Sequence, residues 1–404
     1  MTKYHSFKRK IDDHWENITM PKTELSTAIQ HESVYVILLV VLFSAFACSQ
    51  NTNHQIKIMG QHRGLKWEEE CLQQKPEWYG TDEAQRIADN MLYYQNEDGG
   101  WPKNLNMTAP LAKGKKILRE DPDLSMSTID NSATYTQMRF LDRVYLKTKK
   151  QVYADAFVKG FDYLIRAQYE NGGWPQFYPL RKGYYTHITF NDDAMVGVLF
   201  LLKDITKQPE LYPFINAAQR EKANLAIEKG IKCILKCQVK VDGKLTAWCA
   251  QHDEKTFAPA KARSYELPSL SGKESVGIVE FLMSLEKPDS SIIQSVQSAV
   301  KWFDRVRIKG LMKKWVSDSS VEGGYNKITY KDPGAPPIWA RFYEIGTNQY
   351  FFCNRDGSKH YDLSELTAER RNDYGWLGYW PEELLTKFYP EWQKKWAPDN
   401  NVLQ

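Results

Sequence analysis

The sequence has little net charge, few cysteines and no long strand pattern. Its 54 basic and 50 acidic residues leave only +4, which gives no argument for nucleic-acid binding, although a local basic groove for an acidic ligand is compatible with it. No His pair or second Cys pair accompanies Cys233 and Cys237 at zinc spacing, so we expect structural cysteines and no zinc site. Stretches such as Lys327–Tyr330 and Tyr350–Cys353 fit only short ribbons in loops.

A membrane-spanning run is also missing, because the longest apolar run, Val34 to Ala47, has about 14 residues and a spanning helix needs about 20. That length is typical of the h-region of a signal peptide. Cys48 follows directly, as in a bacterial lipoprotein signal, and Met20 is an alternative start. We therefore predict a signal peptide over 1–48, a linker over 49–76 and a main domain over 77–404. The protein would be secreted, or held at the bacterial cell envelope (outer membrane or periplasm) by a lipid; a plain membrane anchor is the alternative.

What the chain does have is a helical pattern. Hydrophobic residues make up 42% and charged residues 26%, which favours a packed core over disorder. Five segments have helical length and periodicity, and the fourth is apolar nearly all round, so it should be buried on most sides. They are Asp82–Gln95, Asn131–Lys147, Val152–Gln168, Ala194–Ile205 and Arg220–Gln238.

One loop recurs between these helices. EDGGWPK at Glu97–Lys103 returns about 73 residues later as ENGGWPQ at Glu170–Gln176. Paired glycines allow positive φ at a helix end, and proline blocks further helix. Each copy leads to a new helix start, TIDNSA at Thr128–Ala133 and TFNDDA at Thr189–Ala194. Helical hairpins repeated in this way predict an all-α toroid whose loops gather at one end as a groove; a two-layer helical bundle is the alternative.

Acidic and amide residues stand at these helix starts. Asp130 and Asn131 open one helix, and Asp192 and Asp193 open the corresponding helix of the next repeat. If the repeats are neighbours, these oxygens converge at the groove, and hard oxygen ligands from two loops suit calcium. Helix capping explains the same residues without a metal, so the residues alone leave the two interpretations about equal.

Three arginines, Arg263, Arg341 and Arg355, lie in motif-rich stretches, the last two in loop-like, aromatic-rich sequence. A guanidinium forms bidentate pairs with carboxylates, so the three together indicate an anionic ligand. A single loop arginine is more often a surface or ion-pair residue, which stays the alternative for each. Trp101, Trp174 and Tyr265 are candidates for stacking on sugar rings, with ordinary packing at least as good an explanation.

Six ordered blocks then make the pattern specific. They are STIDN, NGGWPQFYP, TFNDDAM, WCAQHDEKTFAPAKARSYELPSLSG, ARFYEIGTNQYFFCNRDG and GYWPEELL. Over about Gly80 to Tyr389 the chain resembles the pectate lyases of polysaccharide lyase family 10. The resemblance implies an (α/α)₃ toroid with short β-ribbons in its loops, a calcium cofactor, polygalacturonate as substrate and an arginine as catalytic base.

The resemblance also implies roles for single residues. It places calcium on Asp130 and Asp192, and the base on Arg355. It places substrate binding on Asn131, Arg341 and Arg263, with Lys261 as a stand-in for Arg263. Residues 77–404 would then be the catalytic domain, acting as a monomer without nucleic acid and meeting a membrane only through a lipid anchor.

The chemistry would be a β-elimination that removes the C5 proton of a uronate. A divalent cation on the neighbouring carboxylate stabilises the enolate-like transition state. Guanidinium groups normally stay protonated, but calcium and Arg341 would disfavour a second positive charge nearby, so we expect an alkaline activity optimum.

Two other functions fit parts of the sequence. A glycoside hydrolase on the same toroid needs two carboxyl groups flanking the scissile bond, one of them protonated, for which Asp130, Asp192, Glu266 and Glu344 are candidates. A non-catalytic surface lipoprotein that binds acidic glycans would make no demand on Arg355.

Overall fold

The computed structural model describes residues 66–109, 111 and 125–403. The predicted signal segment with Cys48, and the predicted linker up to residue 65, lie outside these residues. None of the described helices is long and apolar enough to cross a membrane. The chain divides into two units between Gln73 and Gln74, and the second contains every described helix and strand from Pro76 onward.

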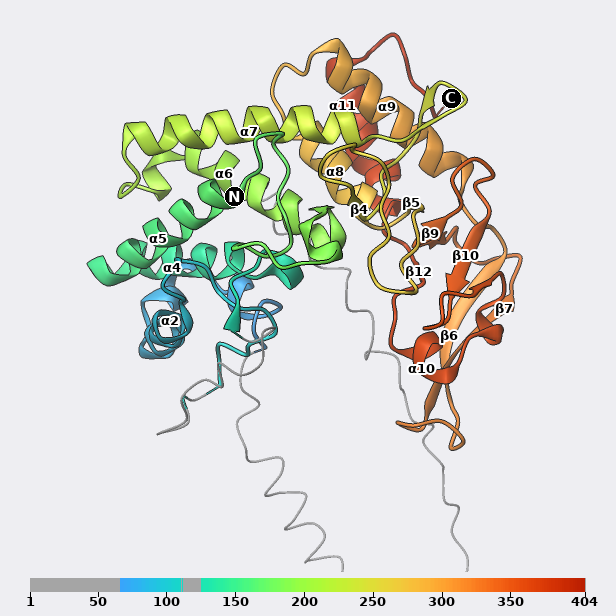
Figure 1. The fold of residues 1–404 in the computed structure, drawn as a ribbon, viewed down its shortest axis with the longest axis horizontal. Coiled ribbons are helices and arrows are strands. Elements are labelled where there is room, and N and C mark those ends of the chain that lie inside the picture. The colour runs from blue at the N-terminus through green and yellow to red at the C-terminus, as the bar shows by residue number, and fades with distance from the viewer. Residues whose placement is uncertain (1–65, 110, 112–124, 404) are drawn as a thin grey trace, which may run out of the picture. The chain divides into compact units, whose positions relative to one another are not determined.

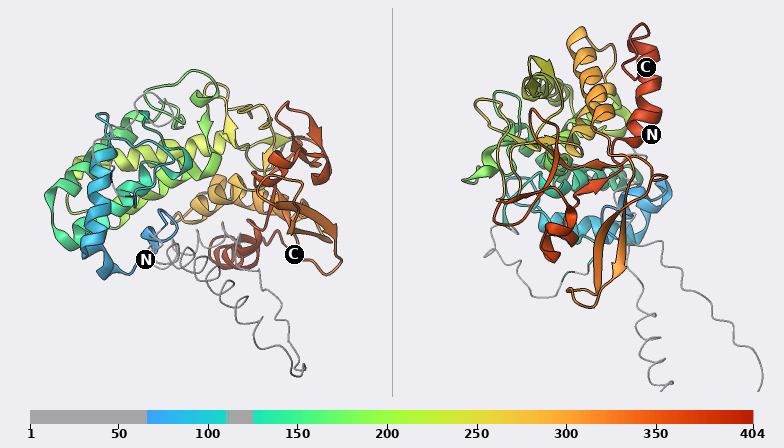
Figure 2. Two further views of the ribbon diagram at one scale, coloured as in Figure 1. Left: turned by 90° about the horizontal axis from the view of Figure 1, so that it is seen from below. Right: turned by 90° about the vertical axis from the view of Figure 1, so that its right-hand side faces the viewer.

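The second unit is built on three consecutive helical hairpins (Figure 1). They are α4–α5 (Tyr135–Thr148 and Gln151–Ala167), α6–α7 (Ala194–Lys207 and Ala217–Cys237) and α8–α9 (Glu274–Met283 and Ser290–Arg305). The first helices of the hairpins, α4, α6 and α8, pack side by side in one layer, and α2 (Asp82–Tyr94), α5, α7 and α9 pack in a second layer (Figure 2). We call α4, α6 and α8 the inner helices and α2, α5, α7 and α9 the outer helices. The predicted (α/α)₃ toroid of helical hairpins with short strands in its loops is therefore confirmed.

The five predicted helices are all present, with the starts of two of them shifted; α7 begins at Ala217 rather than Arg220. Helix α4 begins at Tyr135 rather than Asn131, because Asn131, Ser132 and Thr134 have φ of 47°, 62° and 66°, which an α-helix excludes. Helices α8 and α9 are additional to the prediction, as is α11 (Tyr389–Trp396) near the C-terminus. Asp289 was a usable signal for α9, since its carboxylate caps the helix.

Strands are confined to loops and to the C-terminal part of the chain. β5 (Leu270–Ser271), β9 (Phe342–Tyr343), β10 (Tyr350–Cys353) and β11 (Lys359–His360) form an antiparallel sheet. The other short pairs are β1 (Ile188–Thr189) with β4 (Gln251–His252), β2 (Lys240–Val241) with β3 (Lys244–Leu245), and β8 (Trp339–Ala340) with β12 (Leu377–Gly378).

Of the two predicted β-like stretches, Tyr350–Cys353 is strand β10 and Lys327–Tyr330 lies within β7 (Tyr325–Lys331). The partner strand β6 (Leu311–Ser317) was not predicted, and the β6–β7 hairpin is seven residues long on each side. Most side chains of both strands are only half-buried, so apolar and polar residues do not alternate clearly in the sequence. The described cysteines, Cys71, Cys233, Cys237, Cys249 and Cys353, are all buried and unbridged, in agreement with a structural role.

A tryptophan builds the same corner in successive repeats. Trp101, Trp174 and Trp248 are fully buried, and each indole Nε1 donates at 2.8 Å to a carbonyl of the preceding helix. The acceptors are the carbonyls of Met91, Leu164 and Ile234. The repeat visible in the sequence therefore has a third copy, which keeps the tryptophan but lacks the two glycines and the proline. Trp101 and Trp174 serve packing rather than sugar stacking.

A glutamine at the end of each outer helix completes the corner. Gln168 Nε2 donates to Gly172 O at 3.0 Å in its own loop and to Ala226 O at 2.9 Å in α7. Gln95 and Gln238 make the equivalent pairs of bonds. Each loop is thus fastened to the next outer helix, which fixes where the following inner helix begins.

Gly172 provides a test of this corner. Its φ is +94°, and a Cβ there would lie 2.1 Å from the carbonyl oxygen of Lys229 in α7. Gly172→Ala should lower the free energy of unfolding by about 3 kcal/mol, because left-handed strain and a backbone clash add together. Gly243→Ala is the matched control, since its φ is +72° but no described atom lies within 4 Å of its Cβ position. The control should lose only about 1 kcal/mol in urea unfolding; equal losses would contradict the packing account.

Candidate active site

The turns that precede α4 and α6 are equivalent, and two positions in one turn correspond to two positions in the other. The turn η3 (Asp130–Ser132) leads into α4, η5 (Asn191–Asp193) leads into α6, and the two turns pack against each other. Asn131 (φ 47°, ψ 44°) and Asp192 (φ 49°, ψ 38°) hold the same left-handed position, which Asn and Asp tolerate best after glycine. Asp130 therefore corresponds to Asn191, so the two repeats carry acid and amide in opposite order.

Asp130 is buried and is held by one cation. Its Oδ2 accepts a hydrogen bond from Lys103 Nζ at 2.8 Å. Its Oδ1 is buried and finds no hydrogen-bond partner among the described residues. A buried carboxylate oxygen without a donor is costly unless a positive group completes it, so this oxygen fits a cation ligand.

Asp192 lies between two cations. Its Oδ1 accepts from Lys273 Nζ at 2.7 Å and from Arg341 Nη2 at 3.3 Å, and its Oδ2 accepts from Asn191 Nδ2 at 2.8 Å. Burial alone would raise the pKa of Asp192, but Lys273 and Arg341 together hold that pKa below its usual range. Asp192 is therefore an ionised carboxylate in the folded protein.

Arg341 is buried and links these turns to the strands. It lies between β8 and β9, and its Nη2 donates to Asn191 Oδ1 at 3.0 Å and forms an ion pair with Glu274, the first residue of α8. Burial alone would lower the pKa of Arg341, but Glu274 raises it well above its usual value. Its Nε–H has no partner among the described residues, which leaves one donor for a ligand.

Two tyrosines gather the three predicted arginines in one place. The guanidinium carbons of Arg263 and Arg355 lie 4.9 and 5.7 Å from the ring centre of Tyr265. The guanidinium carbon of Arg341 lies 4.7 Å from the ring centre of Tyr374, and the two rings pack edge to face with centroids 5.5 Å apart. Aromatic faces attract guanidinium groups, so the rings hold like charges close together.

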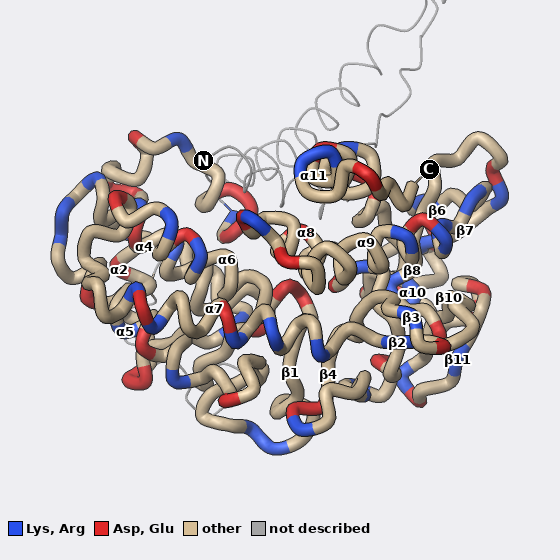
Figure 3. The backbone as a smooth tube through the Cα atoms, turned by 90° about the horizontal axis from the view of Figure 1, so that it is seen from above, with Lys and Arg blue, Asp and Glu red and all other residues tan. Residues whose placement is uncertain are grey.

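Carboxylates balance these arginines. Glu266 accepts from Arg263 Nε at 2.8 Å and from the hydroxyl of Tyr374 at 2.8 Å. Burial alone would raise the pKa of Glu266, but Arg263 lowers it overall. Figure 3 shows the same interleaving of Lys and Arg with Asp and Glu along the rest of the chain, as the small net charge requires.

Arg355 is the most exposed of the three, with 63% of its side chain accessible, and it is bidentate to Glu369 at 2.6 and 3.1 Å. Glu369 also pairs with Arg370 of α10 (Ala368–Asn372), whose guanidinium lies 4.5 Å from the Tyr265 ring centre. Hydrogen bonds from Arg370 and Arg355 lower the pKa of Glu369 to about 2. Arg355 is accessible to a ligand but engaged in an ion pair.

The remaining predicted residues lie outside this network. Asn131 is exposed and donates to Asn104 Oδ1 at 2.8 Å. Lys261 is exposed, two residues before Arg263. The roles of both in substrate binding stay predictions.

Three carboxylates at the helix starts are paired with cations. Lys103, Lys273 and Arg341 contact Asp130, Asp192 and Glu274, and Asp193 is a fourth carboxylate in the same turn as Asp192. The hard oxygens of Asp130 and Asp192 suit calcium. Because their charge is already compensated, a divalent cation would leave excess positive charge unless an anion entered with it.

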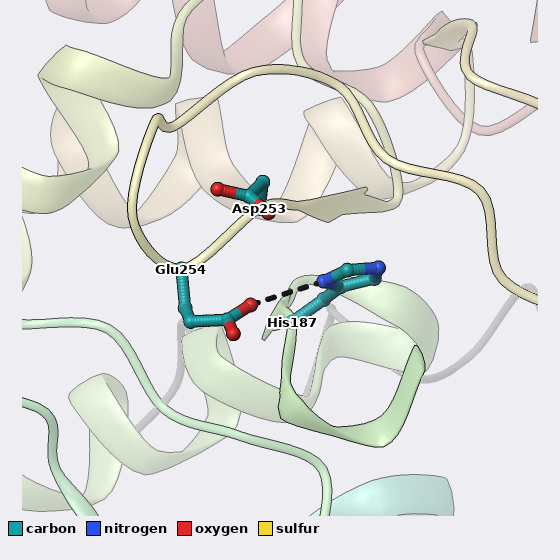
Figure 4. A group of neighbouring side chains, drawn as sticks. All are labelled: His187, Asp253 and Glu254. Carbon is teal, nitrogen blue, oxygen red and sulfur yellow. Dashed lines mark hydrogen bonds and ion pairs between the residues drawn. The ribbon is translucent and has the colours of Figure 1, made fainter. Parts of the chain in front are cut away.

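Another group of metal-type ligands lies beside the β1–β4 pair (Figure 4). Ligand atoms of His187, Asp253 and Glu254 lie within 4.8 Å of one another, the one such trio within the described part of the chain. His187 Nδ1 is 3.2 Å from Glu254 Oε2, and Asp253 Oδ1 accepts from the backbone N–H groups of Lys255 and Thr256. This trio could hold a cation, but its present contacts join two loops, and it does not include Asp130 or Asp192.

Comparison with known proteins identifies the family. The family model described as pectic acid lyase matches residues 95–385. A solved structure described as a family 10 polysaccharide lyase from Cellvibrio cellulosa is 39% identical, with 76% of this chain and 91% of that chain covered and a TM-score of 0.67. The chain belongs to polysaccharide lyase family 10. This pectate lyase therefore carries the predicted α/α fold, and the non-catalytic binder is excluded.

A second structure from the same organism is an aspartate-to-alanine mutant of the family 10 lyase in complex with trigalacturonic acid. It is 37% identical to this lyase, with 80% of this chain and 96% of that chain covered and a TM-score of 0.67. No curated protein matches the sequence.

Several residues of the site were not predicted from the sequence. They are Lys103, Lys273, Glu274, Glu369, Arg370 and Tyr374. The segment SGKES, which contains Lys273, is a third helix start of the same repeat. Ser271 N–H donates to Trp248 O at 2.7 Å, as Thr189 N–H donates to Trp174 O at 3.1 Å. Recognising this third repeat in the sequence would have pointed to Lys273.

Proposed function

We propose that this family 10 lyase cleaves polygalacturonate by calcium-dependent β-elimination, with Arg355 as the base. The observation that carries the proposal is the gathering of Arg263, Arg341 and Arg355 around Tyr265 and Tyr374. Fixed guanidinium groups match the carboxylates on successive uronates. The complex of a 37% identical relative with trigalacturonic acid supports the same substrate class.

The arginines would divide the work. Elimination removes the C5 proton and expels the 4-linked oxygen, which takes a proton from water, and a 4,5-unsaturated uronide remains. Arg263 and the free Nε–H of Arg341 would orient uronate carboxylates, and the exposed Arg355 would take the proton once it leaves Glu369. Calcium held by Asp130 and Asp192 would neutralise the substrate carboxylate and so acidify the neighbouring C–H.

The hydrolase alternative needs a carboxyl group that stays protonated. The pKa values of Asp192 and Glu266 lie below their usual values, as described above. Hydrogen bonds from Lys359 and Tyr361 likewise lower the pKa of Glu344. These three candidates are therefore poor general acids, which favours the lyase.

We also propose that the enzyme acts as a monomer outside the cytoplasm, secreted or attached to the bacterial cell envelope through Cys48. The support is the apolar segment before Cys48 and the fit of an extracellular polymer as substrate.

The direct test is to incubate the purified protein with polygalacturonate and follow ultraviolet absorbance with and without calcium. We expect an absorbing unsaturated product, loss of activity with a calcium chelator and recovery on adding calcium back. New reducing ends without absorbance would instead indicate a hydrolase. Full activity in excess chelator would remove calcium from the proposal.

Arg355→Lys tests the base. Lysine keeps the positive charge but not the guanidine, so kcat should fall by at least about a hundredfold while KM changes little. The control is Arg86→Lys on α2, where Arg86 pairs with Glu83; it should keep normal kinetics. Normal turnover in Arg355→Lys would show that another group removes the proton.

A further inference from the structure

The loop between the second GGWP corner and β1 carries an arginine seated on aromatic rings. The guanidinium carbon of Arg181 lies 4.2 Å from the ring centre of Tyr185 and 5.3 Å from that of Phe177. Tyr184 packs on Tyr185 with ring centroids 4.1 Å apart and an interplanar angle of 35°. Arg181, Tyr184 and Tyr185 are all half-buried, so they combine a fixed position with access to solvent.

One side of this loop joins the Asp130 turn. Phe177, the ring beneath Arg181, also lies 5.4 Å from Lys103 Nζ, and Lys103 holds Asp130. A backbone hydrogen bond also joins the two loops, since Ile129 N–H donates to Gln176 O at 3.2 Å. Arg181 and Lys103 therefore contact the same ring, that of Phe177, and Lys103 is the cation paired with Asp130, the predicted calcium ligand.

The other side of the loop faces the arginine cluster. Burial and the neighbouring Tyr185 raise the pKa of Tyr184, and Arg263 and Glu266 are close enough to act on it. Contacts thus connect Arg181 with Tyr185 and, through it, with Tyr184, and the charges of Arg263 and Glu266 act on Tyr184.

We propose that Arg181, seated on Tyr185 and Phe177, is an additional uronate-binding residue that extends the guanidinium row beyond the reacting sugars. The proposal rests on the proposed function and names a further part of its substrate site. Arg181 binds the carboxylate of a galacturonate outside the cleaved pair, and the rings of Tyr184 and Tyr185 supply a flat surface for that sugar. A methyl ester at that position removes the charge that Arg181 recognises.

Such a residue changes substrate binding rather than chemistry. Losing one charge-assisted contact should raise KM for polygalacturonate about tenfold and leave kcat close to normal. The increase in KM should be much smaller on highly methyl-esterified pectin, which offers fewer carboxylates. Selectivity for unesterified polymer over esterified pectin should therefore fall.

The experiment compares Arg181→Ala with Lys182→Ala, since Lys182 is the exposed neighbour of equal charge. KM and kcat are measured on both polymers, and binding is measured separately by affinity electrophoresis in gels containing polygalacturonate. Arg181→Lys, which keeps the charge but not the planar group, should bind with intermediate affinity and covers the case in which the alanine variant misfolds. We expect Lys182→Ala to change KM by less than about twofold.

Three results would overturn the proposal: equal effects of the two alanine variants, wild-type KM in Arg181→Ala, or an equal loss on both polymers. The first would indicate general surface charge, and the last would remove carboxylate recognition. Failure of the proposed function is distinguishable, because it would appear as a wild-type protein that forms no unsaturated product, whereas the gel measures Arg181 without turnover.

Discussion

The buried guanidinium of Arg341 is the contact on which the site depends. It meets Asp192 in the turn before α6, Glu274 at the start of α8 and the ring of Tyr374. The backbone follows the same connection, since Gly272 N–H donates to Arg341 O at 3.0 Å and Arg341 N–H donates to Trp376 O at 2.8 Å. An unpaired buried charge costs about 3–5 kcal/mol, so side chain and backbone together hold the strand segment against the helix ends.

Charge balance at the helix starts bears on how metal and substrate bind. The carboxylates of Asp130, Asp192 and Glu274 are already paired with three cations there. A divalent cation and a uronate carboxylate each disturb that balance alone, but together they nearly preserve it. Their binding free energies should therefore be coupled, each ligand raising affinity for the other. The site is suited to a metal that arrives with a polyanion rather than to a permanently bound ion.

The sequence predicted the helices and the corner loops because their signals are local. Helical periodicity and the GGWP residues can each be recognised within a short window. The partners of the site cannot, because Arg341 and Asn191 are 150 residues apart and Lys273 and Asp192 are 81 apart. The correspondence of Asn131 with Asp192 follows from aligning TIDNSA with TFNDDA, and the shared backbone angles confirm it. Strand β6 was not predicted because half-buried strands carry little alternation.

Burial divides the arginines by what a substrate can displace. The ion pair of Arg341 with Glu274 is buried. If a uronate took the place of Glu274 on Arg341, the carboxylate of Glu274 would stay buried without this partner, which is costly. The pair of Arg355 with Glu369 is largely exposed, and such pairs contribute less than about 1 kcal/mol. Glu369 can therefore be released from Arg355 at small cost, as the proposed base requires. A fixed Arg341 and a loosely held Arg355 match the proposed division between orienting the substrate and removing its proton.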